Sequence, residues 1–338
     1  MNPPPLDDVI AAIEKHQSFI IAGHVGPDGD AIGSGLALRL ALEALGKEAS
    51  LVSSDGVPPA CRFLPGWQSV TGTVSRQPQC AIVIDCNGLP NRVAAPYHFI
   101  ENARYKVLID HHRTSRPIFD VNWIDASQPA TASMLYQVLK RFPITITADI
   151  AQCLLCGLST DTGNFRFPNT TPESLLAASE LVSLGADPAL IAFKLFDERS
   201  LESTRLLGMA LQKMQAECQG ELMWTALTAG DFESAKTGDE GSENIVNVLR
   251  SVRGARMAII LRERCDETGP VARISVRCDP ELRADLFCEQ FGGGGHAAAS
   301  GCRMRYRPFA ESVQVVVKAA CDWLQEDHPP LEFEEGKI

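Results

Sequence analysis

Short apolar runs alternate with helical patterns through the first half of the chain. Residues 18–24, SFIIAGH, predict a buried strand, and the β-branched segments EASLVSS, CAIVIDC and YKVLIDHH predict three more. Apolar residues at helical spacing predict helices over 30–46, 131–142 and 148–161. Because strands that alternate with helices form βαβ units, we expect an α/β fold with a mostly parallel sheet.

The pattern changes after about Leu211. Strand-like segments separated by polar turns, with one or two helices, then predominate, and this part is richer in arginine. Helical patterns dominate the boundary region before it. We therefore predict a first domain over 1–187, a helical linker over 188–210 and a smaller second α/β domain over 211–330.

Composition and charge narrow the class of protein. The chain has 338 residues, of which 45% are hydrophobic and 22% charged, and these are ordinary values for a soluble globular protein. No apolar run is long enough to cross a bilayer and the N-terminal segment lacks the pattern of a secretion signal, so we expect a cytoplasmic protein with no membrane partner. A net charge of −11 argues against binding to long duplex nucleic acid. It still permits a small anionic substrate if bound cations or a local basic cluster reverse the field near the site.

The cysteines fit a reduced, intracellular chain. There are 11, an odd number, and they are scattered. Cys153 and Cys156 have the spacing of a redox or zinc pair. No second pair completes a zinc set, so we interpret both as small core residues on one face of a helix.

Carboxylates and histidines follow several of the apolar elements. His24 ends the first predicted strand, and Asp28 and Asp30 stand in the turn that leads to the next helix. Asp85 follows CAIVI, Asp110, His111 and His112 end YKVLIDHH, and Asp161 ends an apolar helical segment. One aspartate after a strand is ordinarily a turn former or a helix cap. Four such cases, two of them with histidine, instead indicate a shared site at the carboxyl ends of the strands.

A cluster of buried carboxylates requires compensation. Like charges repel and lose solvation unless cations neutralise them, and two divalent ions would do so. Paired metal ions also clamp the attacking and leaving oxygens of a phosphoryl displacement. A ligand set of carboxylates with two imidazoles favours Mn²⁺ or a related first-row ion over Ca²⁺, while Mg²⁺, Co²⁺ and Zn²⁺ stay open.

The second half carries a glycine run and candidate anion ligands. Gly292 to Gly295 cannot lie inside a helix, so the run is either a flexible loop or a backbone cradle for a substrate anion. We favour the cradle, with Gly293, Gly294 and Gly295 close to the anion, His296 on the phosphate or the base, and HAAASG as the start of a helix. Arg262 and Arg277 are candidates for substrate phosphates, with a solvated strand face as the alternative. A metal site in one domain and an anion cradle in the other imply a cleft between them.

These motifs resemble a known family. The segments HVGPDGDAIGS, VIDC, IDHH and STDTGNF resemble the four motifs of the DHH phosphoesterases, and FGGGGHAAASG resembles the signature of their DHHA1 substrate-binding domain. Residues 242–263 resemble the branch of bifunctional oligoribonucleases and phosphatases of 3′-phosphoadenosine 5′-phosphate (pAp). Ala298 and Asn244 depart from the family's usual residues, which bears on substrate preference.

The resemblance implies roles for individual residues. One metal ion would be bound by His24, Asp28 and Asp85, and the other by Asp30, Asp85, His111 and Asp161, so that Asp85 bridges. His112 would contact the phosphate or assist the leaving oxygen, or else make a purely structural hydrogen bond, and Asp110 would orient a histidine.

The resemblance also implies the reaction and its alternatives. It predicts a homodimeric, Mn²⁺-dependent hydrolase that cleaves very short single-stranded RNA to 5′-mononucleotides and converts pAp to AMP. A phosphodiesterase acting on cyclic or linear dinucleotides would use the same residues. A non-catalytic nucleotide-binding regulator is a further alternative, but every expected ligand position is filled.

Overall fold

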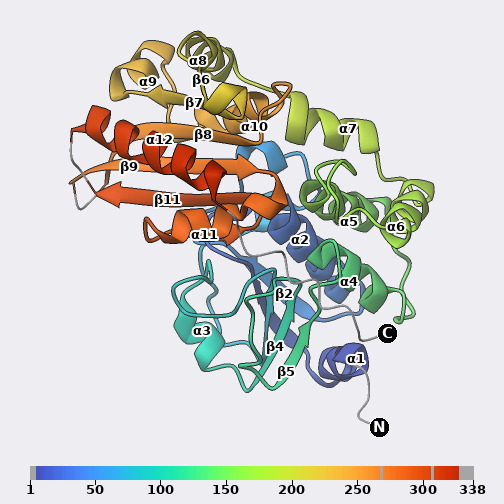
Figure 1. Ribbon diagram of the computed structural model, residues 1–338. Coiled ribbons are helices and arrows are strands. Elements are labelled where there is room, and N and C mark those ends of the chain that lie inside the picture. The colour runs from blue at the N-terminus through green and yellow to red at the C-terminus, as the bar shows by residue number, and fades with distance from the viewer. Residues whose placement is uncertain (1–4, 267–268, 306–307, 327–338) are drawn as a thin grey trace. The chain divides into compact units, whose positions relative to one another are not determined.

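The chain forms two compact units, residues 1–198 and 199–338 (Figure 1). The computed structural model describes residues 5–266, 269–305 and 308–326, without the side chain of His296. The boundary falls inside the segment expected as a linker, which divides between the units: α7 (Pro188–Ala192) and the π-helical turn η3 (Phe193–Asp197) lie in the first, and α8 (Leu201–Gln212) in the second.

The first unit is built on a five-stranded parallel sheet, as predicted. Its strand order is β2-β1-β3-β4-β5, and every neighbouring pair is parallel. The bounds are β1 Ser18–Ala22, β2 Glu48–Val52, β3 Cys80–Ile84, β4 Tyr105–Asp110 and β5 Val121–Ile124. The helices are α1 Pro5–Lys15, α2 Gly29–Ala44, α3 Tyr97–Glu101, α4 Thr131–Leu139, α5 Ala148–Asp161 and α6 Pro172–Ser183, with 3₁₀ turns η1 Pro59–Cys61 and η2 Trp67–Ser69.

Both faces of this sheet are buried, because successive side chains of a strand point to opposite sides. In β1, Phe19 and Ile21 belong to a core shared with α1, α2, α4 and α5, whereas Ile20 and Ala22 belong to a core on the other face that includes Ile100 of α3. Cys153 and Cys156 are buried in α5, which confirms their interpretation as core residues.

The second unit contains a six-stranded mixed sheet of order β10-β11-β9-β8-β7-β6, in which only the β7–β8 pair is parallel. The bounds are β6 Gln215–Glu217, β7 Leu222–Leu227, β8 Met257–Asp266, β9 Gly269–Cys278, β10 Gly294–His296 and β11 Ala299–Arg305. The remaining elements are α9 Ala229–Ala235, α10 Ile245–Arg250, α11 Ala284–Glu289, α12 Phe309–Gln325 and the 3₁₀ turns η4 Cys218–Gly220, η5 Asp239–Ser242 and η6 Pro280–Leu282.

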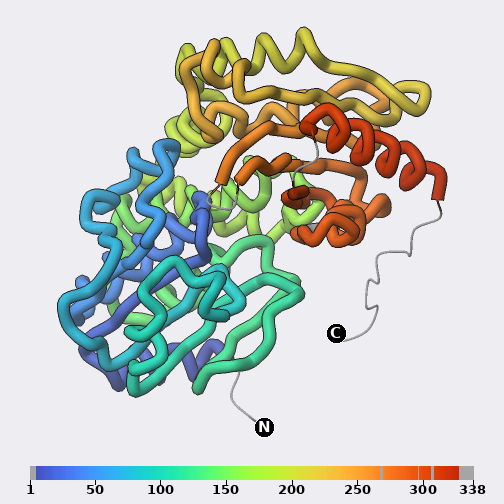
Figure 2. The backbone as a smooth tube through the Cα atoms, turned by 90° about the vertical axis from the view of Figure 1, so that its left-hand side faces the viewer, coloured from blue at the N-terminus to red at the C-terminus, as the bar shows by residue number. Residues whose placement is uncertain are grey.

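Helices cover the two faces of the second sheet differently. Figures 1 and 2 show α12, in red, along one face of the orange strands, where its apolar side packs with α11. The opposite core joins α8, α9 and α10 to β7 and β8. The expectation of one or two helices here was wrong, because short helices such as α9, α10 and α11 give too few turns for a periodic pattern.

Helix length gives a separate finding on membranes. Within residues 5–266, 269–305 and 308–326, no single helix is long and apolar enough to span a bilayer. The pair formed by α6 and residues 188–197 reaches that length and composition only together, and it is bent by 117°.

Candidate metal centre

The candidate site lies where the strand order of the first sheet reverses. The chain leaves β1 toward β2 on one side, and β3 continues the sheet on the other. Ligands of open parallel sheets bind outside the carboxyl ends of strands at such a point. His24 follows β1, Asp85 follows β3, and His111 follows β4, so the topology brings them to one edge.

Asp28 and Asp30 reach this edge through the start of α2. Asp28 is the N-cap of the helix, and its Oδ1 accepts the backbone N–H groups of Asp30 at 2.9 Å and Ala31 at 3.1 Å. The cap uses one oxygen, and nearly half of the Asp28 side chain stays exposed. A cap and a ligand are therefore compatible roles for the same carboxylate.

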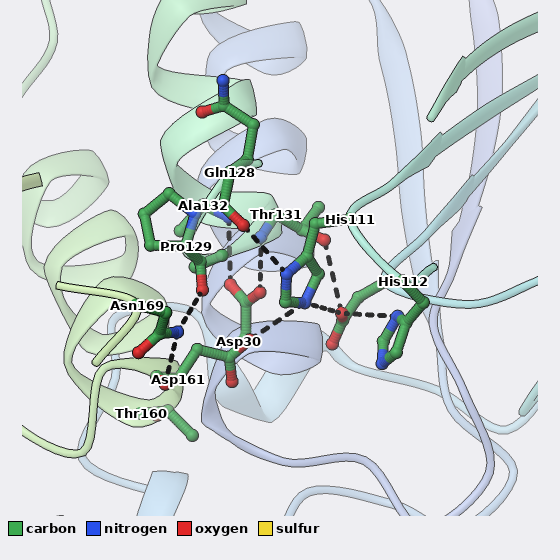
Figure 3. A network of polar contacts seen from close by, with 12 residues as sticks. Asp30, His111, His112, Gln128, Pro129, Thr131, Ala132, Thr160, Asp161 and Asn169 are labelled. Atoms are coloured by element: carbon green, nitrogen blue, oxygen red, sulfur yellow. Dashed lines mark hydrogen bonds and ion pairs between the residues drawn. The ribbon is translucent and has the colours of Figure 1, made fainter. Parts of the chain in front are cut away.

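The carboxylate of Asp30 is fully buried against the N-terminus of α4. It accepts the N–H groups of Thr131 at 2.6 Å and Ala132 at 3.0 Å (Figure 3). It also accepts the hydroxyl of Ser34 at 2.9 Å. Unsatisfied N–H groups and the helix dipole favour an anion there. Gly157 permits this approach, because a Cβ at that position would lie 2.5 Å from Asp30 Oδ1.

Asp85 occupies the centre of the site in a strained backbone conformation. Its φ is 50°, a left-handed value that costs energy for residues other than glycine, and its side chain is almost fully buried. Its oxygens lie 3.5 Å from His24 Nε2, 3.4 Å from His111 Nε2 and 3.3 Å from Thr131 Oγ1. The turn after β3 therefore places the Asp85 carboxylate close to both His24 and His111.

Backbone carbonyls orient the two histidines so that Nε2 faces the carboxylates. His111 Nδ1 donates to Gln128 O at 3.3 Å, and His24 Nδ1 donates to Val25 O at 3.0 Å. In the neutral form of each ring, Nε2 would then carry the lone pair that a metal ion binds. His111 Nε2 is buried without a hydrogen bond of good geometry, 3.0 Å from Asp161 Oδ2 (Figure 3).

His112 belongs to a second polar chain at the end of β4. Its Nδ1 donates to Asp110 Oδ1 at 2.7 Å, and the Ser115 hydroxyl donates to Asp110 Oδ2. Asp110 is fully buried, whereas the His112 side chain is partly exposed. Asp110 therefore holds the ring of His112, and Ser115 holds Asp110.

Burial and close approach shift the pKa values of the acids and histidines in the site. Burial raises the pKa of Asp161 to about 7 despite His111, and burial with the nearby Asp85 and Asp161 raises that of Asp30 well above its usual range. Burial would lower the pKa of His24, but Asp28 and Asp85 outweigh it and raise that pKa to about 11. His111 behaves likewise, with its pKa raised to about 12. Protons compensate the negative charge here in the way that cations would.

The structure brings all six expected ligands together. Their candidate ligand atoms lie within 4.8 Å of one another in sets that share Asp85, and these sets could hold metal ions. His111 Nε2 is buried without a well-formed hydrogen bond, and the mix of carboxylate and imidazole around it fits a divalent first-row ion. The sets are His24, Asp28 and Asp85; Asp30, Asp85, His111 and Asp161; and Asp85, His111 and His112.

The arginines expected to bind substrate lie in the second unit. Arg262 of β8 donates to the hydroxyls of Ser242 at 3.2 Å and Ser275 at 2.5 Å. Arg277 of β9 donates from Nε to Asn247 Oδ1 at 3.1 Å. Both arginines are therefore held in place by their own unit.

The glycine run forms a hairpin. The expectation of a helix at HAAASG was wrong, because residues 294–296 and 299–305 pair as antiparallel β10 and β11. A Cβ at Gly293 would lie 2.3 Å from Gly301 O, and Gly295 has a φ of 151°, so strand pairing itself requires glycine at both positions. Gly294 is exposed, and the side chain of His296 lies outside the described part of the structure.

Several residues that hold the candidate ligands in place were not predicted from the sequence. Gln128, Thr131 and Ala132 act through backbone groups, which carry no signature of residue type. Asn169 Nδ2 donates to the carbonyls of Asp161 and Pro129 and ties α5 to the loop before α4. The sequence offers one signal for this contact, because Ala130 at the N-cap of α4 has no side chain that could cap the helix, and a buried helix N-terminus needs a partner.

Comparison with known proteins places the chain in a family. Residues 18–158 match the model described as "DHH family, N-terminal domain". The chain is 34% identical over 313 residues to the bifunctional oligoribonuclease and PAP phosphatase NrnA of Thermus thermophilus, covering 92% of this chain and 91% of that protein. It is 25% identical to the Bacillus subtilis protein of the same name, covering 93% and 98%. The chain belongs to the DHH family of phosphoesterases.

Its position within the family follows from the same matches. Both named relatives align along nearly their whole length, across both units, which places the chain in the branch that contains these bifunctional enzymes. An exopolyphosphatase-related protein from Bacteroides fragilis has the same fold, with a TM-score of 0.86, 23% identity and coverage of 95% of this chain and 98% of that one.

Proposed function

We propose that the protein is a metal-dependent phosphoesterase that cleaves very short oligoribonucleotides to 5′-mononucleotides and removes the 3′-phosphate of pAp to give AMP. The observation that carries the proposal is that the candidate ligand sets share Asp85, and two of them together contain all six expected ligands. The names of the relatives from Thermus thermophilus and Bacillus subtilis support the choice of substrates.

The proposed ligands fall into two sets. His24, Asp28 and Asp85 would hold one ion, and Asp30, Asp85, His111 and Asp161 would hold the other. Paired divalent ions supply Lewis acidity to a phosphoryl group and make water a nucleophile at neutral pH. We favour Mn²⁺, with Mg²⁺ or Co²⁺ as alternatives, because imidazole and carboxylate together suit these ions.

The protein's own residues orient and protonate the substrate. Asp110 orients the ring of His112 through Nδ1, and the His112 side chain is partly exposed, so we assign His112 to contact the phosphate or assist the leaving oxygen. Arg262 and Arg277, the backbone of Gly293, Gly294 and Gly295, and His296 would bind the nucleotide. Arginine recognises phosphate through two parallel hydrogen bonds, which explains their assignment.

A turnover panel in Mn²⁺ tests the proposal. It compares RNAs of about two to five nucleotides, a long RNA, pAp and cyclic di-AMP. Asp85→Asn removes the shared anionic ligand but keeps a residue type that tolerates a left-handed φ, and Asp322→Asn on exposed α12 is the matched control. We expect rapid turnover of the shortest RNAs and pAp that is lost only in Asp85→Asn. Turnover confined to cyclic di-AMP would reassign the substrate, and inactivity without bound metal would indicate a binding protein.

A further inference from the structure

One face of the second sheet carries an unusual concentration of arginine. Arg262 of β8 pairs directly with Arg273 of β9, and Arg273 pairs on its other side with Arg303 of β11. Directly opposed residues share a face, so these three form a row across the sheet. Arg264 and Arg305 flank Val271 in the adjacent row, and Arg277 lies further along β9.

The alternation of side chains confirms which face this is. Ala272, Ile274 and Val276 of β9 and Cys302 of β11 belong to the core formed with α11 and α12. The residues between them, among which are the arginines, therefore point to the opposite side. Helices α8, α9 and α10 cover that side at β7 and β8, where Phe232 lies 3.2 Å from the guanidinium of Arg264.

The charge of this face is poorly balanced. Like charges directly opposite each other destabilise a sheet, yet the row contains two such pairs. Asp239 compensates part of the cluster, at 3.9 Å from Arg262, 3.0 Å from Arg264 and 2.7 Å from Arg273. Arg303 and Arg305 are exposed, and neither takes part in an ion pair within the described residues.

We propose that Arg273, Arg303 and Arg305 form a phosphate track for RNA longer than a dinucleotide, extending the subsite of Arg262 and Arg277. The inference rests on the proposed function and specifies its substrate as an oligonucleotide that lies across β8, β9 and β11. Adjacent strands are about 4.8 Å apart and residues two apart on a strand are about 7 Å apart. The row and its neighbour thus offer cations at several points on a surface about 10 Å wide, which suits successive phosphates.

The local field supports an anionic ligand. The whole chain has a net charge of −11, so a cluster of arginines on one sheet face is a local reversal of the field. Non-specific recognition of single-stranded nucleic acid uses such positive grooves along the backbone. Within the second unit, a mononucleotide such as pAp would need only Arg262 and Arg277, and a longer strand would continue onto the track.

Charge reversal of the exposed arginines tests the track. Arg303→Glu with Arg305→Glu is compared with Lys318→Glu, which makes a similar change on exposed α12 at the opposite face. We expect KM for a five-nucleotide RNA to rise about tenfold in the double variant, from roughly two- to fivefold per exposed contact. We expect pAp and dinucleotide turnover to keep their wild-type kcat and KM.

Salt dependence gives a second measurement. The slope of log KM against log salt for the five-nucleotide RNA should fall by about 0.7 for each phosphate contact removed, with no change for pAp. Equal effects on all substrates, or no effect on the longer RNA in a folded and active variant, would overturn the track. If the wild-type protein cleaves no RNA of any length, the proposed function fails instead.

Discussion

The substitution Asp161→Asn should have opposite effects on the stability of the protein without metal and on its stabilisation by bound metal. Asp161 ends α5, its carboxylate is mostly buried, and its closest charged partner is His111 Nε2 at 3.0 Å. Burial raises the pKa of Asp161 to about 7 from a usual value of 3.8, in spite of His111. Asparagine keeps the shape of the side chain and removes the charge.

The sign and size of the effect follow from this shift. An acid whose pKa is raised by folding destabilises the fold above that pKa, and the penalty vanishes below the usual pKa. The shift corresponds to a penalty of about 4 kcal/mol at pH 8, and loss of the His111 contact and relaxation of the site reduce it. We therefore expect metal-free Asp161→Asn to be about 1–3 kcal/mol more stable than wild type at pH 8.

Urea denaturation in EDTA measures the stability without metal, and denaturation in Mn²⁺ measures the stabilisation by bound metal. In EDTA the variant should unfold at higher urea than wild type, and the difference should disappear near pH 4. Saturating Mn²⁺ at 100 times its Kd should stabilise wild type by about 2.7 kcal/mol. The variant should gain less, because it lacks one candidate ligand. Destabilisation of the variant in EDTA at pH 8, or equal gains from Mn²⁺, would refute the reasoning.

Three further substitutions test two contacts of the metal centre and the ion pairs of the arginine face. Gly157→Ala should lower kcat by about 100-fold and cost about 1–3 kcal/mol in urea denaturation, because its Cβ would displace the buried carboxylate of Asp30; a stabilised, fully active variant would contradict this. Ser115→Ala should reduce kcat by about 10- to 100-fold with unchanged metal content, because Asp110 loses its donor, and wild-type kcat would count against that role. Burial would raise the pKa of Asp239, but its arginine partners lower it, so Asp239→Asn should be destabilised at pH 7 and the difference should shrink below about pH 4. Equal differences in urea denaturation at pH 7 and pH 3 would show that these ion pairs do not stabilise the fold.

The strands and long helices of the first unit could be predicted because both carry strong patterns. The helix expected over 148–161 is α5 with the same bounds, and the expected runs correspond to β1, β2, β3 and β4. The four-residue strand β5 and the three-residue strands β6 and β10 were not predicted, since they are too short to show a period. The glycine run was expected to lead into a helix and instead forms a hairpin with β11, because pairing with a neighbouring strand overrides local propensity.

The candidate ligands could be found from sequence because each follows an apolar element, and parallel strands bring their carboxyl ends together. The backbone donors at Thr131 and Ala132 could not be found, since any residue type supplies an N–H group. The sequence showed that the second half is rich in arginine, but it did not show that several of these arginines share one face of a sheet. Arg262, Arg273 and Arg303 lie far apart in the sequence, and only the register of β8, β9 and β11 aligns them.

The metal content of the purified protein tests the central claim most directly. Two ligand sets that share Asp85 predict about two Mn²⁺ ions per chain after reconstitution and removal of free metal. Asp85→Asn should retain fewer than one ion, whereas Asp322→Asn should retain about two. A single ion in the wild-type protein, or two ions retained in Asp85→Asn, would contradict a paired centre bridged by Asp85.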